Sequence, residues 1–272
     1  MPTLGPGRLI AINNTFLTAL FNFLSRFFAA LAEEQAEQED TMAFVTEWTG
    51  APPYRYIDVS RYQGSITPEG WKKVKAAGYQ GVMLKTVSTN RRLSKRADGL
   101  YIDPTFEANY RNAKAAGLAV GVYYYTYATS EAMADAELSL LADALRGKTL
   151  EMPVAVDVED NKFRVLGKQT LTDLTAYALK KVEDMGFYAQ LYTYTSFAKT
   201  RLYMGGAALS PYDVWLADTG KTPAVTFAYN AHQHTSKGSV PGISGHVDLN
   251  VTTRNYPKII CKKGLTRLRE GK

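Results

Sequence analysis

The sequence is short of cysteine and of uninterrupted apolar runs. Its 272 residues include a single cysteine, Cys261, so a disulfide framework is excluded and nothing indicates an oxidising compartment. No stretch matches the roughly 20 mostly apolar residues that a membrane-spanning helix needs. The chain also lacks a G-x-S-x-G nucleophile motif and a G-x-x-x-x-G-K-[ST] phosphate loop, which removes the usual signals of serine hydrolases and P-loop proteins.

What is present is a globular composition with an excess of basic charge. Apolar residues make up 46% of the chain, enough to bury a substantial core. The net charge of +6 favours polyanions such as nucleic acid, anionic lipid or bacterial cell wall. Much of the excess lies in residues 258–272, where six cations face only Glu270. We interpret this segment as a solvated basic tail, with a dedicated anion-binding element as the alternative.

Residues 1–50 are expected to form a separate element. In "FLTALFNFLSRFFAALAEEQ" the apolar residues follow one helical stripe and the polar residues the opposite one, which predicts an amphipathic helix. A signal peptide is the alternative, because "ALA" before Glu33 resembles a cleavage site, but Asn22 and Arg26 interrupt its apolar core. An acidic run after the helix indicates a solvated linker, and Met42 leaves a later natural start open.

From Tyr54 onward, helix and strand patterns alternate. The stretches 67–78 and 105–117 each begin with a threonine suited to an N-cap and end with a glycine suited to a left-handed C-cap. An apolar run follows each of them, and the pattern recurs around Gly186. Continuous apolar strands between helices indicate a parallel sheet with helices on its outside.

Eight strand candidates suggest a closed α/β barrel. They are "YRYIDVS", "GVMLKTV", "AVGVYYYTY", "MPVAVDVED", "FYAQLYTY", "DVWLAD", "TFAYNAHQHT" and "GHVDLNVT". The later candidates lack long helices between them, so we expect an irregular eight-stranded (β/α) barrel of TIM-like type over residues 51–257, with an incomplete outer helix ring. The basic stretch 88–99, "STNRRLSKRADG", is expected to be a loop.

Carboxylates gather where apolar strands end. Asp58 ends the first candidate, Asp157 and Glu159 the fourth, and Asp248 the last. Because the carboxyl ends of barrel strands form the functional face, these acids are expected to meet at one mouth. Crowded carboxylates cannot all ionise cheaply, so one would stay protonated near neutral pH. Glycosidic bond cleavage has this requirement, since a general acid works beside a second carboxylate.

The acids, histidines and tyrosines also allow other interpretations. Each acid could instead cap a helix or pair with a basic side chain, and the cluster could hold a hard cation, although its members do not fall in one calcium-type loop. His232 and His234 alternate toward one face but have no third ligand for zinc, so no metal and no cofactor are predicted. The run Tyr123, Tyr125 and Tyr127 could stack on sugar rings or fill the core.

Four stretches together resemble the family 25 glycoside hydrolases, which are muramidase-type lysozymes. They are "YIDVSRYQG" (56–64), "YIDPTFEANYRNAKAAGLAVGVYYY" (101–125), "AVDVED" (155–160) and "VPGISGHVDLN" (240–250), and the resemblance spans residues 54–256. The resemblance implies an irregular eight-stranded barrel that cuts the β-1,4 bond between N-acetylmuramic acid and N-acetylglucosamine in peptidoglycan.

The resemblance also implies roles for the four acids. Glu159 would be the general acid and base, and Asp157 would stabilise the reacting centre or orient the acetamido group of the substrate. Asp58 and Asp248 would hold this network and tune its protonation, and the resemblance favours retention of configuration. Seven further residues are candidates for substrate binding: Tyr62, Gln63, Tyr123, Tyr125, Tyr192, Trp215 and Gln233.

The sequence departs from the family pattern around the sugar cleft. Ser88 stands where the family usually has the acid of Thr-Glu-Gly, and His232 and His234 flank Gln233 where Trp-Gln-Tyr is usual. Thr219 replaces an aromatic residue four positions after Trp215. A shifted subsite preference or low activity is therefore expected, and the alternative function is a noncatalytic wall-binding or structural virion protein on a degenerate muramidase barrel.

The expected partner is bacterial peptidoglycan, with no nucleic acid. We expect a phage or prophage lysin or a virion-associated protein, made in the host cytoplasm without a clear signal peptide and acting at the cell wall. Residues 10–32 are the candidate for docking on a virion or a membrane surface.

Overall fold

The computed structural model describes residues 20–28, 44–220 and 222–269. The chain divides into two units, Met1–Met42 and Ala43–Lys272. In the first unit residues 20–28 are helical, as the amphipathic pattern predicts, while Met42 and the remainder of the stretch 10–32 lie outside the described residues. Within the described part of the chain, no helix is both long and apolar enough to cross a membrane.

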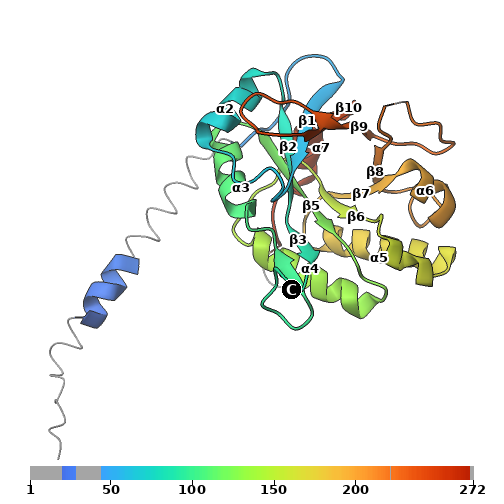
Figure 1. Ribbon diagram of the computed structural model, residues 1–272, viewed down its shortest axis with the longest axis horizontal. Helices are drawn as coiled ribbons and strands as arrows, with labels where there is room; N and C mark the ends of the chain where they lie inside the picture. Colours follow the sequence, from blue (N-terminus) through green and yellow to red (C-terminus); the bar gives the residue numbers. More distant parts are fainter. Residues whose placement is uncertain (1–19, 29–43, 221, 270–272) are drawn as a thin grey trace, which may run out of the picture. The chain divides into compact units, whose positions relative to one another are not determined.

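The second unit is built on a closed eight-stranded barrel (Figure 1). Around the barrel the strands follow the order β1, β10, β9, β8, β7, β6, β5, β2. Their bounds are β1 Tyr54–Val59, β2 Gly81–Lys85, β5 Ala119–Tyr125, β6 Val154–Asp157, β7 Ala189–Tyr194, β8 Asp213–Ala217, β9 Ala231–Gly238 and β10 Val247–Thr252. The predicted α/β barrel and its eight strand candidates are confirmed.

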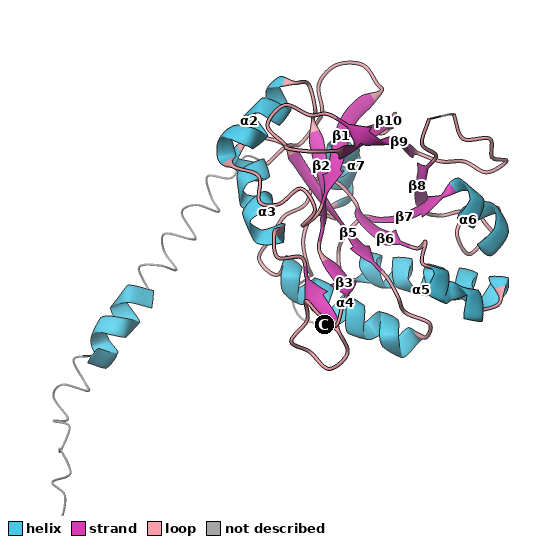
Figure 2. Ribbon diagram, in the orientation of Figure 1, coloured by secondary structure: helices cyan, strands magenta, loops and turns pink. Residues whose placement is uncertain are grey.

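Helices cover part of the outside of the barrel (Figure 2). They are α2 Pro68–Ala76, α3 Phe106–Ala115, α4 Glu131–Leu145, α5 Lys168–Asp184, α6 Thr195–Arg201 and α7 Tyr256–Lys263, with the 3-10 helix η1 at Asn161–Val165. The helix α2 packs beside α3, and α4 beside α5. Among the described residues no helix lies between β8 and β9 or between β9 and β10, so the ring is incomplete as expected.

The expectation of a parallel sheet is wrong at the closure of the barrel. The strand β10 pairs antiparallel with both β9 and β1, whereas the other neighbouring pairs are parallel. The physical reason is the short connection over residues 239–246, because a parallel crossover needs about a dozen residues or more. The start of β10 therefore lies at the same end of the barrel as the carboxyl ends of the other strands.

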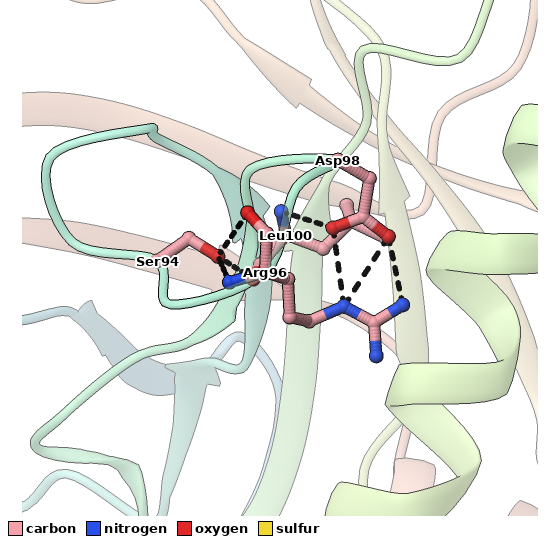
Figure 3. Close-up of polar contacts among 4 residues, drawn as sticks. All are labelled: Ser94, Arg96, Asp98 and Leu100. Carbon is pink, nitrogen blue, oxygen red and sulfur yellow. Dashed lines mark hydrogen bonds and ion pairs between the residues drawn. The ribbon is translucent and has the colours of Figure 1, made fainter.

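The basic stretch 88–99 is part of a hairpin that the sequence did not reveal. The strands β3 (Val87–Thr89) and β4 (Leu100–Ile102) pair antiparallel outside the barrel and pack against α4 and β5. Figure 3 shows how the connecting loop is ordered: Arg96 Nη2 donates to Asp98 Oδ2 at 2.7 Å, and Leu100 N donates to Asp98 Oδ1 at 3.0 Å. Ser94 Oγ accepts from Arg96 N at 2.9 Å. Three-residue strands are too short to show a period-2 pattern.

Local sequence signals explain the helix ends only in part. Thr67 Oγ1 accepts from Gly70 N at 3.1 Å, as the predicted N-cap of α2. Thr105 occupies the N-cap position of α3, but its hydroxyl donates to Asp103 Oδ1 at 2.7 Å instead of capping the helix. Gly78 follows α2 with φ of 86°, the left-handed conformation predicted for it.

The end of the barrel opposite to the strand carboxyl ends is closed by large side chains. Trp48 and Met152 are buried there, and Trp48 Nε1 donates to the carbonyl of Gln80 at 3.0 Å. The basic segment from residue 258 also lies on this unit, since it contributes α7 and Thr266 bridges Phe187. Closure at this end leaves the opposite end of the barrel as its mouth.

Candidate functional site

The four acids singled out in the sequence line one pocket at the barrel mouth. Asp58 is on β1, Asp157 is the last residue of β6, Glu159 lies two residues further on, and Asp248 is the second residue of β10. The pocket has a volume of about 210 Å³. The expectation that Asp248 ends its strand is wrong, because β10 runs antiparallel and brings its first residues to the mouth.

Asp58 and Asp248 face each other across the β1–β10 pair. They are register partners, and their carboxyls share a side-chain hydrogen bond. Asp58 Oδ2 also accepts from Gln233 Nε2 at 3.0 Å and from Asn250 Nδ2 at 2.8 Å. Burial and then the charge of Asp248 raise the pKa of Asp58 well above its usual value, while the two amide donors oppose this rise. A hydrogen bond between two carboxyls requires a proton on one of them.

Glu159 and Asp157 form the second pair of acids. Burial raises the pKa of Glu159 to about 7, with Lys85 opposing the rise and Asp160 and Asp248 adding to it. Burial and the neighbouring Glu159 charge raise the pKa of Asp157 well above its usual value. Asp157 Oδ1 is buried and has no hydrogen-bond partner among the described residues. The pocket therefore combines a carboxyl that titrates near neutrality with a free acceptor.

Lys85 is the basic side chain that lines the pocket. It is the last residue of β2, half-buried, and its Nζ lies 4.9 Å from the ring centroid of Tyr125. Its charge lowers the pKa values of both Asp157 and Glu159. A cation at this place favours the ionised form of these acids and limits how far burial raises their pKa values.

All seven candidate substrate-binding residues line the pocket, but at different depths. Trp215 and Gln233 are buried: Trp215 Nε1 donates to Asn250 Oδ1 at 2.9 Å, and Gln233 Oε1 accepts from Tyr192 Oη at 3.0 Å. Tyr62 is 77% exposed. The deep residues support Asp58 through hydrogen bonds, whereas Tyr62 is free to meet a ligand.

Tyrosines form one wall of the mouth. Tyr123 packs edge-on against Trp215 at 6.2 Å between ring centroids, and Tyr125 lies 4.9 Å from Tyr127. Tyr125 Oη donates to Asp160 Oδ2 at 3.1 Å. Tyr124 is fully buried on the other side of β5. The alternation seen in the sequence thus separates tyrosines at the mouth from one that fills the packing behind the sheet.

Two residues of this site, Lys85 and Asn250, were not predicted from the sequence. The signal for Lys85 is that it is the one charged residue in the apolar run "GVMLK" and stands at its end. The signal for Asn250 is that it follows Asp248 by two positions, since residues two apart on a strand point to the same face. Neither signal identifies a partner, because the contacts with Asp58 and Glu159 join segments far apart in the sequence.

The departures from the family pattern fall mostly outside the pocket. Ser88 is buried in β3 opposite Tyr101, and Thr219 is exposed beyond β8. His232 and His234 alternate with the inward-pointing Gln233, and His232 Nε2 lies 3.0 Å from the carbonyl oxygen of Asp218. In the described part of the chain, no three His, Cys, Asp or Glu side chains are arranged so that they could hold a metal ion.

Comparisons with known proteins agree with this geometry. A model of the glycosyl hydrolases family 25 matches residues 57–243. The chain is 29% identical over 199 residues to an autolytic lysozyme of Clostridium acetobutylicum, covering 71% of this chain and 54% of the relative. It is 29% identical over 209 residues to lysozyme M1 of Streptomyces globisporus, covering 71% of this chain and 66% of the relative. The chain thus spans about half to two thirds of the length of these relatives.

The fold is also found among solved structures. The crystal structure of the CTP1L endolysin superposes with a TM-score of 0.61 at 26% identity, covering 77% of this chain and 70% of the other. The family match includes Asp58, Asp157 and Glu159 and extends over most of the barrel. The chain belongs to the glycosyl hydrolases family 25.

Proposed function

We propose that this barrel hydrolyses peptidoglycan at the β-1,4 bond between N-acetylmuramic acid and N-acetylglucosamine. The observation that carries the proposal is the convergence of Asp58, Asp157, Glu159 and Asp248 in one tyrosine-walled pocket. Two curated relatives are described as lysozymes, which supports the same reaction.

Glu159 is the general acid and base of the proposed reaction. A carboxyl with a pKa of about 7 is still protonated in part of the population at neutral pH, so it can give its proton to the leaving oxygen. After the bond breaks, the resulting carboxylate can take a proton from water. Lys85 keeps this pKa from rising further.

Asp157 is proposed to act on the reacting sugar. Its buried Oδ1 lacks a partner among the described residues, so it can accept a hydrogen bond from the acetamido N–H of the substrate. An acetamido group held in this way can itself attack the anomeric carbon, which is substrate-assisted retention. A negative Asp157 would also stabilise the positive charge that develops on the sugar.

Asp58 and Asp248 are proposed to set the protonation of the site. Asp58 is held by Gln233 and Asn250, and we propose that it shares one proton with Asp248, whose charge and hydrogen bond both raise the pKa of Asp58. The pair carries one negative charge instead of two while the proton is shared, which lowers the repulsion felt by Glu159 and Asp157. Its role is thus electrostatic and positional.

Replacement of Glu159 by glutamine tests the proposal. We expect Glu159→Gln to clear purified bacterial walls about 10²- to 10⁴-fold more slowly, because glutamine cannot transfer the proton. Clearing is measured by turbidity, and the released muropeptides are identified by mass spectrometry after reduction. The matched control is Glu69→Gln, an exposed acid on α2. Equal clearing by wild type and Glu159→Gln would reject catalysis and leave a noncatalytic wall-binding protein.

The biological setting of a phage or prophage lysin, or of a virion-associated enzyme, belongs to the same proposal. The likeness to the CTP1L endolysin structure supports it. In this setting the protein is made in the host cytoplasm and acts at the cell wall.

The N-terminal helix is proposed to dock on a membrane surface or a virion. Six large apolar side chains of residues 20–28 are exposed: Leu20, Phe21, Phe23, Leu24, Phe27 and Phe28. At 100° per residue they fall on one side of the helix, with Asn22, Ser25 and Arg26 on the other, which is the pattern of an interfacial helix.

Deletion of residues 1–41 separates docking from catalysis. We expect the remaining protein to fold and to clear walls as the full chain does, because the chain divides after Met42. The full chain should float with lipid vesicles or remain with virions, and the deleted form should not. Loss of soluble protein on deletion would instead mean that the helix is needed by the barrel.

A further inference from the structure

Two basic side chains lie close in sequence to residues that line the pocket: Arg61 stands between Ser60 and Tyr62, and Lys162 follows Glu159 by three positions. In the part of the chain that the structure describes, none of the ion pairs involves Arg61 or Lys162. Each is held over a tyrosine: Arg61 Cζ lies 4.3 Å from the ring centroid of Tyr62, and Lys162 Nζ lies 4.5 Å from that of Tyr127. Their charges are therefore held in place by aromatic rings and remain available to an anion.

Arg61 is fixed on the β1 side of the rim. Its Nη2 donates to Tyr62 Oη at 3.0 Å, and its backbone N donates to Asp103 Oδ2 at 3.0 Å. A side-chain hydrogen bond to Tyr101 raises the pKa of Arg61. These contacts use only part of the guanidinium, which has five N–H donors, so donors remain for a carboxylate from outside.

Lys162 belongs to the same patch. Its backbone N donates to Asp160 Oδ1 at 2.8 Å, which fixes the start of η1. The ring beneath its ammonium group, Tyr127, packs at a tilt of 41° against Tyr125 of the pocket wall. Lys162 is thus linked to the pocket through Tyr127 and Asp160, both of which contact the lining residue Tyr125.

The arrangement places positive charge at the rim and negative charge in the depth of the pocket. An anionic substrate would be repelled by four carboxylates unless cations nearer to solvent offset them. In peptidoglycan, N-acetylmuramic acid carries a short stem peptide with free carboxylates. A glycan bound in the pocket must direct this peptide outward, past the rim.

We propose that Arg61 and Lys162 bind carboxylates of the stem peptide, so that the enzyme selects peptide-bearing over bare glycan. This inference rests on the proposed function and names the part of the substrate that the rim recognises. Tyr62 and Tyr127 position the two cations and present flat surfaces to the peptide stem. Chemical amidation of the peptide carboxylates should remove the preference.

The test compares two substrates made from the same walls. One is glycan that carries its stem peptides, and the other is glycan from which an amidase has removed them. The initial rate of formation of new reducing ends gives kcat/KM for each. We expect the wild type to prefer the peptide-bearing glycan, and this preference should shrink as salt is added because the contacts are exposed ion pairs.

Removal of the charges of Arg61 and Lys162 should lower the preference for peptide-bearing glycan. We expect Arg61→Gln/Lys162→Gln to reduce the ratio of the two kcat/KM values by about threefold to tenfold, the size of two exposed charge contacts. The charge-keeping variant Arg61→Lys/Lys162→Arg should retain most of the ratio. The control Lys73→Gln/Lys262→Gln removes the same charge from exposed sites on α2 and α7 and should keep the wild-type ratio.

The outcomes separate this inference from the proposed function. Equal rates of the wild type on both glycans, or equal losses of the double variant on both, would overturn stem-peptide binding while hydrolysis stands. A preference that survives amidation would assign the selection to the bulk of the peptide and would also overturn it. Failure of the wild type to release muramic acid reducing ends from either glycan would reject the proposed function.

Discussion

At the scale of single residues, Lys85 shows how one cation sets the working range of several acids. It lowers the pKa values of Glu159 and Asp157, opposing the effect of their burial. Glu159 is the proposed general acid and must be protonated when substrate is bound, so we expect the rate to fall as pH rises through its pKa of about 7. The pH at which the rate falls therefore reports on the charge of Lys85.

Replacement of Lys85 by methionine should move this alkaline fall to higher pH. Without the cation the ionised form of Glu159 loses an attractive partner, so its pKa rises and the acid stays protonated longer. The measurement is kcat/KM as a function of pH on solubilised glycan. The quantity compared is the pH at which kcat/KM falls to half of its maximum, and not the maximum itself. Lys72→Met, an exposed change on α2, is the control. A fall that stays in place or moves to lower pH would contradict the assigned role of Lys85.

At the scale of elements, the connection from β5 to α4 is fixed by a buried carboxylate. Glu137 of α4 accepts from Thr126 Oγ1 and, at 2.9 Å, from Tyr127 N. Thr126 N in turn donates to the carbonyl of Asp157 at 3.1 Å. One side chain thus connects α4, the tyrosine-bearing loop and the end of β6. Burial raises the pKa of Glu137 to about 7.

Truncation of this carboxylate should loosen the loop. We expect Glu137→Ala to lower the free energy of unfolding by about 2–4 kcal/mol, because the buried Thr126 hydroxyl and the partly buried Tyr127 N–H lose their acceptor. It should also raise KM for glycan more than it lowers kcat, since Tyr125 and Tyr127 would lose their fixed position. Denaturant unfolding and initial rates measure both effects. Glu137→Gln keeps the shape and one acceptor and should lose less; equal losses would point to packing alone.

The sequence predicted elements better than it predicted their neighbours. Apolar runs marked most of the barrel strands, because burial on both faces leaves a continuous apolar pattern, whereas β9 and β10 alternate between buried and partly exposed residues. The reversal of β10 and the pairing of β3 with β4 depend on connection length and partner choice, which no local pattern records. Asp248 illustrates the difference: its place in the pocket was expected, but it arrives from the start of an antiparallel strand.

The same limit applies inside the site. The acids could be named because charge is unusual at the end of an apolar strand. The amide donors of Asn250 and Gln233, which hold Asp58 from β10 and β9, are distant in sequence and carry no comparable signal. Thr105 fits an N-cap by type and position, yet its hydroxyl donates to Asp103. The side chain could bond either to the helix backbone or to Asp103, and the local sequence does not decide between them.

At the scale of the whole molecule, the barrel contains an ion pair remote from the mouth. Lys114 of α3 pairs with Glu151, which precedes β6, and both side chains are almost fully buried. Glu151 Oε2 also accepts from Val120 N at 3.1 Å. Burial raises the pKa of Glu151, and Lys114 opposes the rise. The pair joins a helix to two strands without taking part in the pocket.

Removal of one partner should destabilise the whole barrel. We expect Lys114→Met to lower the free energy of unfolding by about 3–5 kcal/mol, because it leaves a buried carboxylate without its cation. The double change Lys114→Met/Glu151→Gln should recover part of this loss, since glutamine is neutral and still accepts from Val120 N. Thermal and denaturant unfolding provide the measurement. A single variant as stable as the wild type would show that the pair contributes little.

The reversed strand β10 is the last strand in the sequence, so the residues that it brings to the pocket are also the last of the site to be synthesised. Asp248 and Asn250 reach Asp58 only after β10 has entered between β9 and β1. A chain that ended after β9 would lack both residues and could not close the barrel between β9 and β1. We therefore expect the proposed wall-cutting activity only in chains that have been made and folded through residues 247–252.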